Sequence, residues 1–263
     1  MTATLAVALE ALAVVAALAL ATWAVSVVRR DASLADRMWP VFIAAAAVVC
    51  WRSLPSAGAR GDAMLALVLV WAVRLCLYIT QRNRGHGEDR RYRAIRARHE
   101  PGFAFKSLYL VFALQAALAW LVAAPFLVGM ASRAPFGVLD AIGAAVAAFG
   151  IAFEAIGDLQ MARFRADARN RGAVMDRGLW RYTRHPNYFG EACVWWGFAL
   201  MALSGSGPAG AWCLVSPLLM TVLLLRVSGV ALLEKDIAER RPAYREYVER
   251  TPAFLPARPR RRH

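Results

Sequence analysis

The sequence predicts an all-α integral membrane protein, a bundle of seven transmembrane helices with a polar cytoplasmic crown. Of its 263 residues, 59% are hydrophobic, and the mean hydropathy is +0.43. The apolar residues form long blocks that arginine-rich segments separate. About 20 apolar residues are needed to cross the ~30 Å hydrocarbon core of a bilayer. Several blocks approach that length, so the chain is expected to cross the membrane repeatedly.

The expected spans follow one another along a single membrane domain, residues 1–263, without an internal repeat or a soluble domain. The first span has neither a basic leader nor a small-residue cleavage site, so we expect it to be retained rather than removed as a signal peptide. The second and sixth are short, which makes the count six to seven. The spans are expected at about residues 4–28, 38–54, 63–80, 107–130, 137–159, 188–204 and 209–233.

Positive charges alternate between the connections. Lysine and arginine number three after the first span, two after the second, eight after the third, one after the fourth and seven after the fifth. The turn after the sixth span has none, and ten follow from Arg226 onward. Cytoplasmic connections carry the excess of basic residues. We therefore expect the N-terminus outside, the C-terminus in the cytoplasm, and residues 81–106, 163–186 and 234–263 on the cytoplasmic face.

Two short helices are expected in these cytoplasmic segments. Glycine and proline bracket a polar helix after the third span. Near the C-terminus, Tyr244, Tyr247 and Val248 share a helical face, which is typical of an amphipathic helix at the membrane interface. The arginines of residues 258–263 are expected to be disordered or to lie on lipid headgroups. The bracketing residues are Gly85, Gly87, Pro101 and Gly102.

Composition argues against nucleic acid, disulfide and metal chemistry. The topology explains the net charge of +14, and no aromatic-basic platform indicates a nucleic-acid partner. The four cysteines are scattered through apolar segments without CxxC spacing, so they are expected to be small core residues. The four histidines show no ligand spacing such as HExxH, so no metal site is expected.

A dense polar cluster, RHPNYFGE at residues 184–191, directly precedes the sixth apolar block. Charged side chains near the hydrocarbon cost about 2–3 kcal/mol on insertion scales, so they are usually retained because they bind a ligand. Pro186 suits the first turn of a helix, whose N-terminus attracts anions such as a phosphate. The alternative is a helix cap that satisfies neighbouring backbone. The inward stripe would be Asn187, Glu191 and Trp195, and the anion-attracting residues Arg184 and His185.

Two carboxylates end the fifth span. Glu154 and Asp158 lie four residues apart, and Arg163 and Arg165 follow them. Ribose hydroxyls bind carboxylates and phosphates bind guanidinium groups, so Asp158 with Arg163 or Arg165 is a candidate nucleotide site. The alternative is an ion pair within the helix end, which contributes little stability.

The third span carries a polar stripe of Arg74, Tyr78 and Gln81, followed by Asn83. Arg74 lies inside an apolar run, so its side chain either snorkels to the cytoplasmic edge or lines a cavity. A polar stripe along one face favours the cavity.

Acidic and phenolic groups at the cytoplasmic end are candidate proton donors. Asp36 begins the second span, where a protonated carboxyl can donate a hydrogen bond, and capping of that helix is the alternative. The segment GEDRRYR, residues 87–93, holds Glu88 and Tyr92. A solvated charge run is the alternative for this segment.

Five stretches together resemble a known family. Over roughly residues 36–256 the chain resembles bacterial members of the steroid 5α-reductase superfamily, the 3-oxo-5α-steroid 4-dehydrogenase-like membrane proteins of the DUF1295 type. The RHPNYxGE core is specific for the wider superfamily, which includes sterol double-bond reductases, whereas some methyltransferases carry a looser RHPxYxG. The stretches are EDRRYRAIR (88–96), DLQMARFR (158–165), GLWRYTRHPNYFGE (178–191), SGVALLEK (228–235) and YREYVERTPAFLP (244–256).

The resemblance implies a steroid- and lipid-metabolising oxidoreductase of the bacterial inner membrane. Such a seven-helix enzyme binds NADPH from the cytoplasm and admits a lipophilic enone, such as a 3-oxo-Δ4 steroid, from the bilayer. Hydride would pass from the nicotinamide to the β-carbon while an acid pair polarises the carbonyl. By this resemblance and by the polar cluster, the expected cofactor-binding residues are Arg74, Tyr78, Asn83, Asp158, Arg165, Arg184, His185, Asn187, Tyr188, Glu191, Trp195 and Arg226.

The sequence departs from the animal enzymes of that superfamily at the carbonyl-binding residues. Their glutamate follows a glutamine in the second span, and their tyrosine lies one turn before the third-span arginine. Here no Gln-Glu pair exists, and Trp71 stands one turn before Arg74. The candidate catalytic residues are therefore Asp36, Glu88 and Tyr92.

Two other functions compete with this one. An S-adenosylmethionine-dependent lipid or isoprenylcysteine-type methyltransferase would share the looser motif, but only NADPH carries phosphates for the arginines beside residues 184–191. A non-catalytic lipid-binding or transport protein would carry mid-span polar residues or inverted repeats, and Glu10 is the only clear mid-span acid in the first half. Partners are expected to be the lipophilic substrate and membrane lipids, while the physiological substrate, stereochemistry and oligomeric state stay open.

Overall fold

The computed structural model describes residues 2–54, 58–227 and 242–259, and this part of the chain is helical without any strand. Six helical stretches in it are long and apolar enough to cross a membrane. The prediction of an all-α, multi-pass membrane protein is confirmed at this level. The count of seven, the orientation and the choice of membrane stay predictions.

The chain divides into two compact units, each of which is described by itself. The first contains residues 1–141 and 200–216, and the second contains residues 142–199 and 217–263. The expectation of a single membrane domain stays a prediction.

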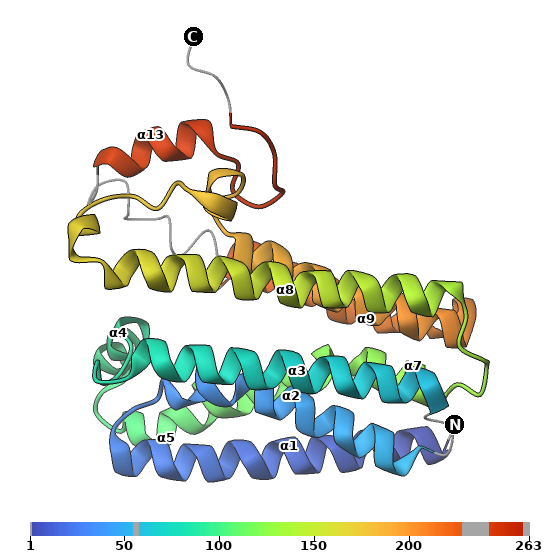
Figure 1. The fold of residues 1–263 in the computed structure, drawn as a ribbon. Helices are drawn as coiled ribbons and strands as arrows, with labels where there is room; N and C mark the ends of the chain where they lie inside the picture. Colours follow the sequence, from blue (N-terminus) through green and yellow to red (C-terminus); the bar gives the residue numbers. More distant parts are fainter. Residues whose placement is uncertain (1, 55–57, 228–241, 260–263) are drawn as a thin grey trace. The chain divides into compact units, whose positions relative to one another are not determined.

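Three long helices begin the first unit: α1 (Thr2–Arg29), α2 (Leu34–Ser53) and α3 (Gly58–Asn83). Helix α2 packs against both α1 and α3 (Figure 1). Each helix begins before its expected span, and α1 and α3 also continue past the expected end. Side chains such as Phe42 and Trp71 are fully buried, whereas Leu5 and Val70 are exposed, as suits helices surrounded by lipid.

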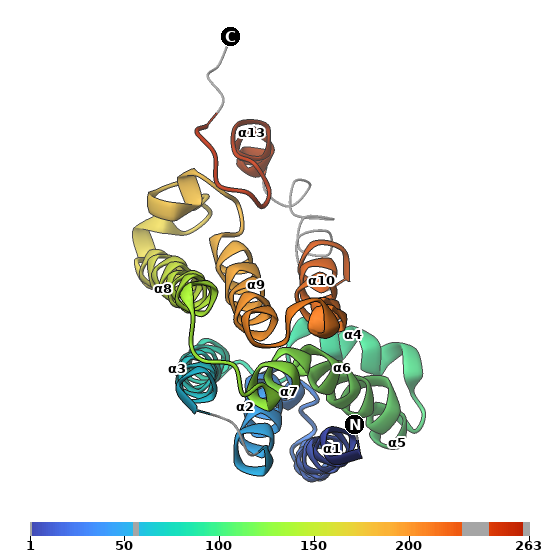
Figure 2. The ribbon, with the colours of Figure 1, turned by 90° about the vertical axis from the view of Figure 1, so that its right-hand side faces the viewer.

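The fourth expected span, 107–130, is a chain of four helical pieces rather than one helix. It consists of α5 (Phe103–Ser107), the π-helical turn η1 (Leu108–Ala113), α6 (Leu114–Val122) and α7 (Ala124–Ala131). Pro125 lies in the first turn of α7, where its missing amide hydrogen leaves no partner unsatisfied. In Figure 2, α6 and α7 lie beside α1 and α2, which they contact.

The short polar helix expected after α3 is α4 (Arg90–His99), and that prediction is confirmed. Asp89 caps it by accepting a hydrogen bond from the backbone amide of Arg91 at 2.9 Å. The bracketing glycines, including Gly87 and Gly102, have positive φ angles, a conformation that side-chain-bearing residues rarely adopt.

A buried ion pair lies in the first unit near the start of α3. Arg60 of α3 donates Nε and Nη2 to the two carboxylate oxygens of Asp140 at 2.6 and 2.9 Å. Ser204 adds a third hydrogen bond to Asp140 at 2.7 Å. Arg60 is 3% exposed and Asp140 is fully buried. The pair joins the start of α3 to Asp140, and Ser204 joins the same carboxylate.

The second unit is built on most of α8 (Val138–Ala166) and α9 (Pro186–Ser206). The start of α8, through Ala141, and the end of α9, from Leu200, belong to the first unit. Their backbones approach closely through glycines. A Cβ added at Gly150 would lie 2.5 Å from the Gly190 carbonyl oxygen, and one at Gly197 would lie 2.6 Å from the Ala147 amide nitrogen. Small residues allow this close packing of helices in a membrane.

We expect Gly150→Val to destabilise the protein, because the added side chain meets backbone that cannot rotate away. Overpacking of this kind costs about 1–3 kcal/mol or more. Thermal unfolding in detergent would measure the loss. Ala148→Val is the matched control, since Ala148 is exposed on the same helix. Equal melting temperatures for the two variants would contradict the close packing of α8 and α9.

The last expected span, 209–233, is described only in part. It contains the 3₁₀ helix η4 (Gly207–Leu214), α10 (Val215–Val222) and the π-helical turn η5 (Leu223–Val227). Residues 228–233 lie outside the described residues, as do 234–241 of the expected cytoplasmic segment and 260–263 of the tail.

The helix expected near the C-terminus is α13 (Pro242–Arg250), so its helical structure is confirmed. Its place at the membrane interface stays a prediction. Tyr244 and Tyr247 are buried on one face, with ring centroids 5.5 Å apart.

Candidate functional site

The polar cluster 184–191 begins α9, which starts at Pro186 as predicted. One turn further along, Glu191 Oε1 accepts a hydrogen bond from Trp195 Nε1 at 2.9 Å, and both side chains are buried. The Oδ1 atom of Asn187 is buried without a hydrogen-bond partner among the described residues. A buried amide oxygen in that state costs free energy unless a ligand donates to it. The stripe therefore offers an acceptor for an amide or amino group.

Arg184 has a structural role that the sequence did not predict. Its Nη1 donates to the carbonyl oxygens of Val248 and Thr251 at 3.0 and 2.6 Å, and its backbone amide donates to the Pro252 carbonyl at 2.9 Å. The side chain is 8% exposed. Arg184 thus fastens the segment after α13 to the start of α9.

The neighbouring aromatic groups are also packed in place. The rings of His185 and Tyr188 are stacked, with centroids 5.2 Å apart and planes 7° apart. Phe189 contacts Phe254 edge to face at 6.1 Å. Together with Arg184 these contacts pre-organise the first turn of α9, which lowers the entropic cost of binding a ligand there.

The carboxylates near the end of α8 are buried, and the arginines beyond them are not. Glu154 and Asp158 are 3% and 4% exposed, whereas Arg163 and Arg165 are exposed. In the described residues, neither arginine forms an ion pair with a carboxylate, so the alternative of an ion pair within the helix does not apply. Arg226, the other expected cofactor residue of this unit, is exposed at η5.

Three expected cofactor residues lie on α3 in the first unit. Arg74 and Tyr78 are half-buried, and the Arg82 guanidinium carbon lies 5.8 Å from the Tyr78 ring centroid. Asn83 accepts from Arg82 Nε at 3.2 Å, while its own Nδ2 is buried without a hydrogen-bond partner among the described residues. Asn83 therefore offers a donor.

A hydrogen-bond network joins Asp36 and Tyr92, two of the three candidate donors. The Tyr92 hydroxyl donates to Asp36 Oδ1 at 2.5 Å, and Arg91 Nη2 donates to Asp36 Oδ2 at 2.7 Å. Gln115 Nε2 donates to the Tyr92 oxygen at 2.9 Å. Tyr92 is 7% exposed. The network places a buried phenol between a carboxylate and an amide.

This network decides between the alternatives for two segments. Both oxygens of Asp36 accept from side chains, so the carboxylate is an acceptor here and caps no backbone amide. The segment 87–93 is not a solvated charge run, because Tyr92 is buried and Arg91 is paired. Burial and the neighbouring Asp36 carboxylate raise the pKa of Tyr92 well above its usual value, so the phenol stays protonated.

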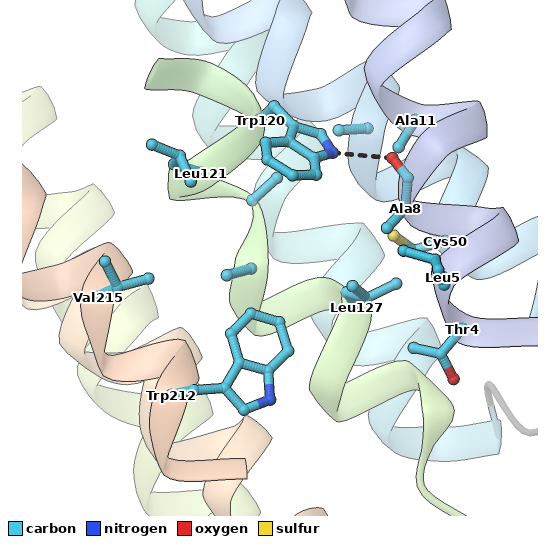
Figure 3. A pocket seen from close by; sticks show the side chains of 13 residues that line it. Thr4, Leu5, Ala8, Ala11, Cys50, Trp120, Leu121, Leu127, Trp212 and Val215 are labelled. Atoms are coloured by element: carbon cyan, nitrogen blue, oxygen red, sulfur yellow. Dashed lines mark hydrogen bonds between the residues drawn. The ribbon is translucent and has the colours of Figure 1, made fainter. Parts of the chain in front are cut away.

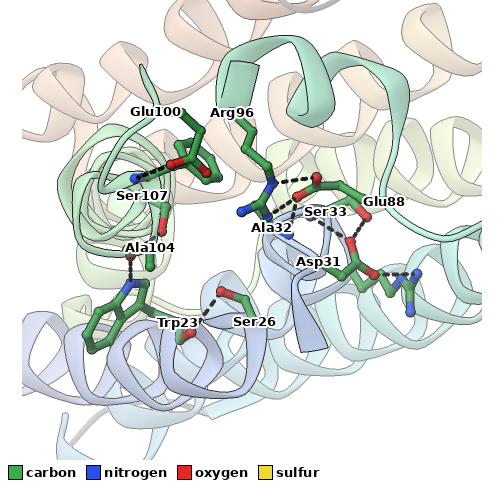
Figure 4. Close-up of polar contacts among 12 residues, drawn as sticks. Trp23, Ser26, Asp31, Ala32, Ser33, Glu88, Arg96, Glu100, Ala104 and Ser107 are labelled. Atoms are coloured by element: carbon green, nitrogen blue, oxygen red, sulfur yellow. Dashed lines mark hydrogen bonds and ion pairs between the residues drawn. The ribbon is translucent and has the colours of Figure 1, made fainter. Parts of the chain in front are cut away.

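Glu88, the third candidate, lies outside the network. It accepts from the Ala32 amide at 2.8 Å and from Arg96 Nη2 at 2.7 Å (Figure 4). Burial alone would raise the pKa of Glu88, but the hydrogen bonds from Arg96 and Ala32 lower it below its usual value. A carboxylate held ionised in this way ties the chain after α1 to α4 and is a poor proton donor.

Comparison with known proteins identifies a family for this chain. Residues 22–251 match the model of a family described as "Protein of unknown function (DUF1295)". The chain belongs to this family. The predicted DUF1295-type membership in a steroid 5α-reductase-like membrane family is thereby confirmed. "Uncharacterized protein C594.04c" of Schizosaccharomyces pombe is 26% identical, over 89% of this chain and 75% of the relative. No solved structure matches.

The DUF1295 chain has one site residue that sequence reasoning missed. Gln115 is an amide within the apolar block 107–130, and it completes the network around Tyr92. Its Oε1 is buried without a hydrogen-bond partner among the described residues. The available signal was the isolated polar side chain itself, because such residues in a span usually mark a functional site.

The first unit of the DUF1295 chain also contains an apolar cavity of about 510 Å³ (Figure 3). The indole of Trp120 forms part of its wall and donates to the Ala8 carbonyl at 2.8 Å. Trp212 of η4 and Cys50 of α2 also line it. Thr4 supplies its one polar side-chain oxygen. A cavity with this lining suits a lipophilic molecule.

Histidine, cysteine, aspartate and glutamate nowhere cluster in groups of three or more that could hold a metal ion, in the part of the chain that the structure describes. The four cysteines are free thiols. The expectation that the protein needs no metal stays a prediction.

Proposed function

We propose that this chain is an NADPH-dependent membrane reductase that reduces the carbon–carbon double bond of a lipophilic enone, such as a 3-oxo-Δ4 steroid. The observation that carries the proposal is the Tyr92 hydroxyl, buried between Asp36 and Gln115. Reduction of an enone needs a neutral donor at the carbonyl oxygen, away from water. The resemblance to the steroid 5α-reductase superfamily supports the cofactor and the substrate class.

The protein's part in the reaction is to polarise the carbonyl and supply a proton. NADPH, when bound, supplies the hydride that adds to the β-carbon of the enone. The Tyr92 hydroxyl hydrogen can rotate from Asp36 to the substrate oxygen. Its proton then passes to the enolate oxygen and gives the enol. Water protonates the α-carbon while the Tyr92 phenolate takes back the enol proton, which leaves the saturated ketone, hydroxide and a neutral Tyr92. Gln115 Nε2 stabilises the transient phenolate oxygen, and Arg91 balances the charge of Asp36.

The residues of the second unit fit a dinucleotide. The buried Asn187 Oδ1 would accept from the carboxamide of the nicotinamide, with Glu191 and Trp195 forming the wall beside it. Asp158 would accept from a ribose hydroxyl, and the exposed Arg165 would bind a phosphate. In the first unit, the buried Asn83 Nδ2 offers a hydrogen-bond donor to a ligand.

A ligand comparison in detergent tests the cofactor. Ligands that bind only the folded state raise its stability, by about 2.7 kcal/mol at 100 times Kd. We expect NADPH to raise the unfolding temperature of the purified chain, NADH to raise it less, and S-adenosylmethionine to leave it unchanged. Stabilisation by S-adenosylmethionine, with methyl transfer to a lipid acceptor, would instead establish the methyltransferase alternative.

Asn187→Ala and Glu191→Ala are expected to abolish turnover of NADPH with a 3-oxo-Δ4 steroid. Each variant removes a polar group of the inward stripe, so each should also lose the NADPH-induced rise in unfolding temperature. Trp196→Phe is the control, because Trp196 is exposed on the same helix. Unchanged activity in both stripe variants would refute the assigned site.

A further inference from the structure

A second cavity, of about 530 Å³, lies in the first unit at the end of α1. The last turns of α1 form one wall, and the end of α4 with the start of α5 forms the other (Figure 4). Its lining mixes charged and apolar residues, unlike the apolar cavity described above. Neither the proposed cofactor residues nor the Tyr92 network belongs to it.

The lining presents one positive and one negative side chain that form no ion pair within the described part of the chain. Arg30 is exposed and forms no ion pair with any described residue. Glu100 accepts only a long hydrogen bond, 3.5 Å, from the Phe103 amide and likewise lacks an ion pair in the described chain. Arg96 also lines the cavity, with its guanidinium held by Glu88 and 4.5 Å from the Phe103 ring centroid. The cavity thus offers a site for a ligand that carries both charges.

The cavity lies at the level where a bilayer crossed by α1 would have its headgroups. The apolar sequence of α1 ends at Arg29. Trp23 donates its indole hydrogen to the Ala104 carbonyl at 2.9 Å. Phe105 and Tyr109 are 66% and 52% exposed and pack edge to face. Aromatic side chains collect at membrane–water interfaces, and exposed apolar residues such as Val28 offer a surface for acyl chains.

We propose that this cavity binds the phosphoethanolamine headgroup of a membrane phospholipid. Arg30, together with Arg96 of the same lining, takes the phosphate, and Glu100 accepts hydrogen bonds from the primary ammonium group. A purely anionic headgroup such as phosphatidylglycerol would meet the Glu100 carboxylate without compensation. Phosphatidylcholine has no N–H hydrogen to donate to that carboxylate. This site is independent of the proposed reductase activity.

Lipid binding to the purified full chain tests the proposal. The delipidated protein would be titrated with phosphatidylethanolamine, phosphatidylglycerol and phosphatidylcholine of identical acyl chains, with binding measured by native mass spectrometry. We expect phosphatidylethanolamine to bind at least about 10-fold more tightly than the other two, a difference of about 1.4 kcal/mol. Glycerophosphoethanolamine, which lacks acyl chains, should not displace it at equal concentration.

Three variants test whether the charges of Arg30 and Glu100 cause the preference for phosphatidylethanolamine. Arg30→Gln should reduce phosphatidylethanolamine binding to the level of phosphatidylcholine, whereas Arg29→Gln, the adjacent exposed arginine outside the cavity lining, should leave it unchanged. Glu100→Gln should reverse the order, so that phosphatidylglycerol binds more tightly than phosphatidylethanolamine.

Several results would overturn the proposal. Equal binding of the three lipids, or equal effects of Arg30→Gln and Arg29→Gln, would show that no headgroup site exists. A preference of the wild-type protein for phosphatidylglycerol would show that the cavity binds anionic headgroups and not zwitterionic ones. Displacement by glycerophosphoethanolamine would show that a soluble ligand, not a bilayer lipid, occupies the cavity.

Discussion

Tyr92→Phe is expected to lower the turnover of NADPH with a 3-oxo-Δ4 steroid by about 100-fold or more, the usual contribution of a general acid. The substitution keeps the buried ring and removes only the hydroxyl that lies between Asp36 and Gln115. Folding should persist, because the phenylalanine ring occupies the same space. Steady-state turnover and the NADPH-induced rise in unfolding temperature would be measured together. Loss of turnover with retained NADPH binding is the expected pattern.

The pH profile of turnover tests the protonation state of Tyr92. Because the pKa of Tyr92 is raised, the hydroxyl stays protonated past the pKa of about 10 that is usual for tyrosine. The wild-type protein should therefore show no loss of turnover from deprotonation of Tyr92 below about pH 10. Tyr92→Phe should leave the shape of that part of the pH profile unchanged. Tyr109→Phe is the control, because Tyr109 is exposed on η1. A Tyr92→Phe protein with wild-type turnover would mean that the donor lies elsewhere.

Arg60→Ala is expected to destabilise the protein by about 3–5 kcal/mol, because it leaves the Asp140 carboxylate buried and uncompensated. Arg60 also donates to the Ala134 and Pro135 carbonyl oxygens at 3.2 and 3.1 Å, and those partners would be lost as well. Thermal or denaturant unfolding in detergent would measure the change. Arg52→Ala is the control, since the Arg52–Glu10 pair is 67% and 40% exposed and should contribute about 0–1 kcal/mol.

A double substitution distinguishes charge from packing in this prediction. Replacing both partners, as Arg60→Met with Asp140→Leu, removes the uncompensated charge while keeping most of the volume. Apolar replacement of a buried pair is often neutral or stabilising, so the double variant should be more stable than Arg60→Ala alone. A double variant as unstable as the single one would show that the guanidinium acts by its shape and its bonds to carbonyl oxygens, not by charge compensation.

Local sequence patterns predicted the helices well. The ~20-residue apolar blocks marked the spans, Pro186 marked the start of α9, and the spacing of Tyr244 and Tyr247 marked α13. These features depend on neighbouring residues, because helix length, proline geometry and the 3.6-residue period are local properties. The breaks within residues 103–131 were not predicted, since apolar composition does not distinguish a continuous helix from one with a π-helical turn and a new start at Ala124.

The candidate site was likewise predicted from the sequence only in part. Sequence spacing predicted the stripe of Asn187, Glu191 and Trp195, because residues four apart share a helix face. It did not predict which donor candidates contact each other. Asp36 and Tyr92 are 56 residues apart on different helices, so no helical spacing relates them.

The sequence by itself determined that this protein is helical and suited to a membrane, and where its polar clusters lie along the chain. Only the tertiary structure decided that Gln115 completes the Tyr92 network and that Glu88 bonds to Ala32 outside that network. It also decided that Arg184 bonds to the C-terminal segment. The physical reason is the separation along the chain over which each interaction acts. Apolar length and helical period act between near neighbours, whereas hydrogen-bond partners across helices are selected by how the helices pack.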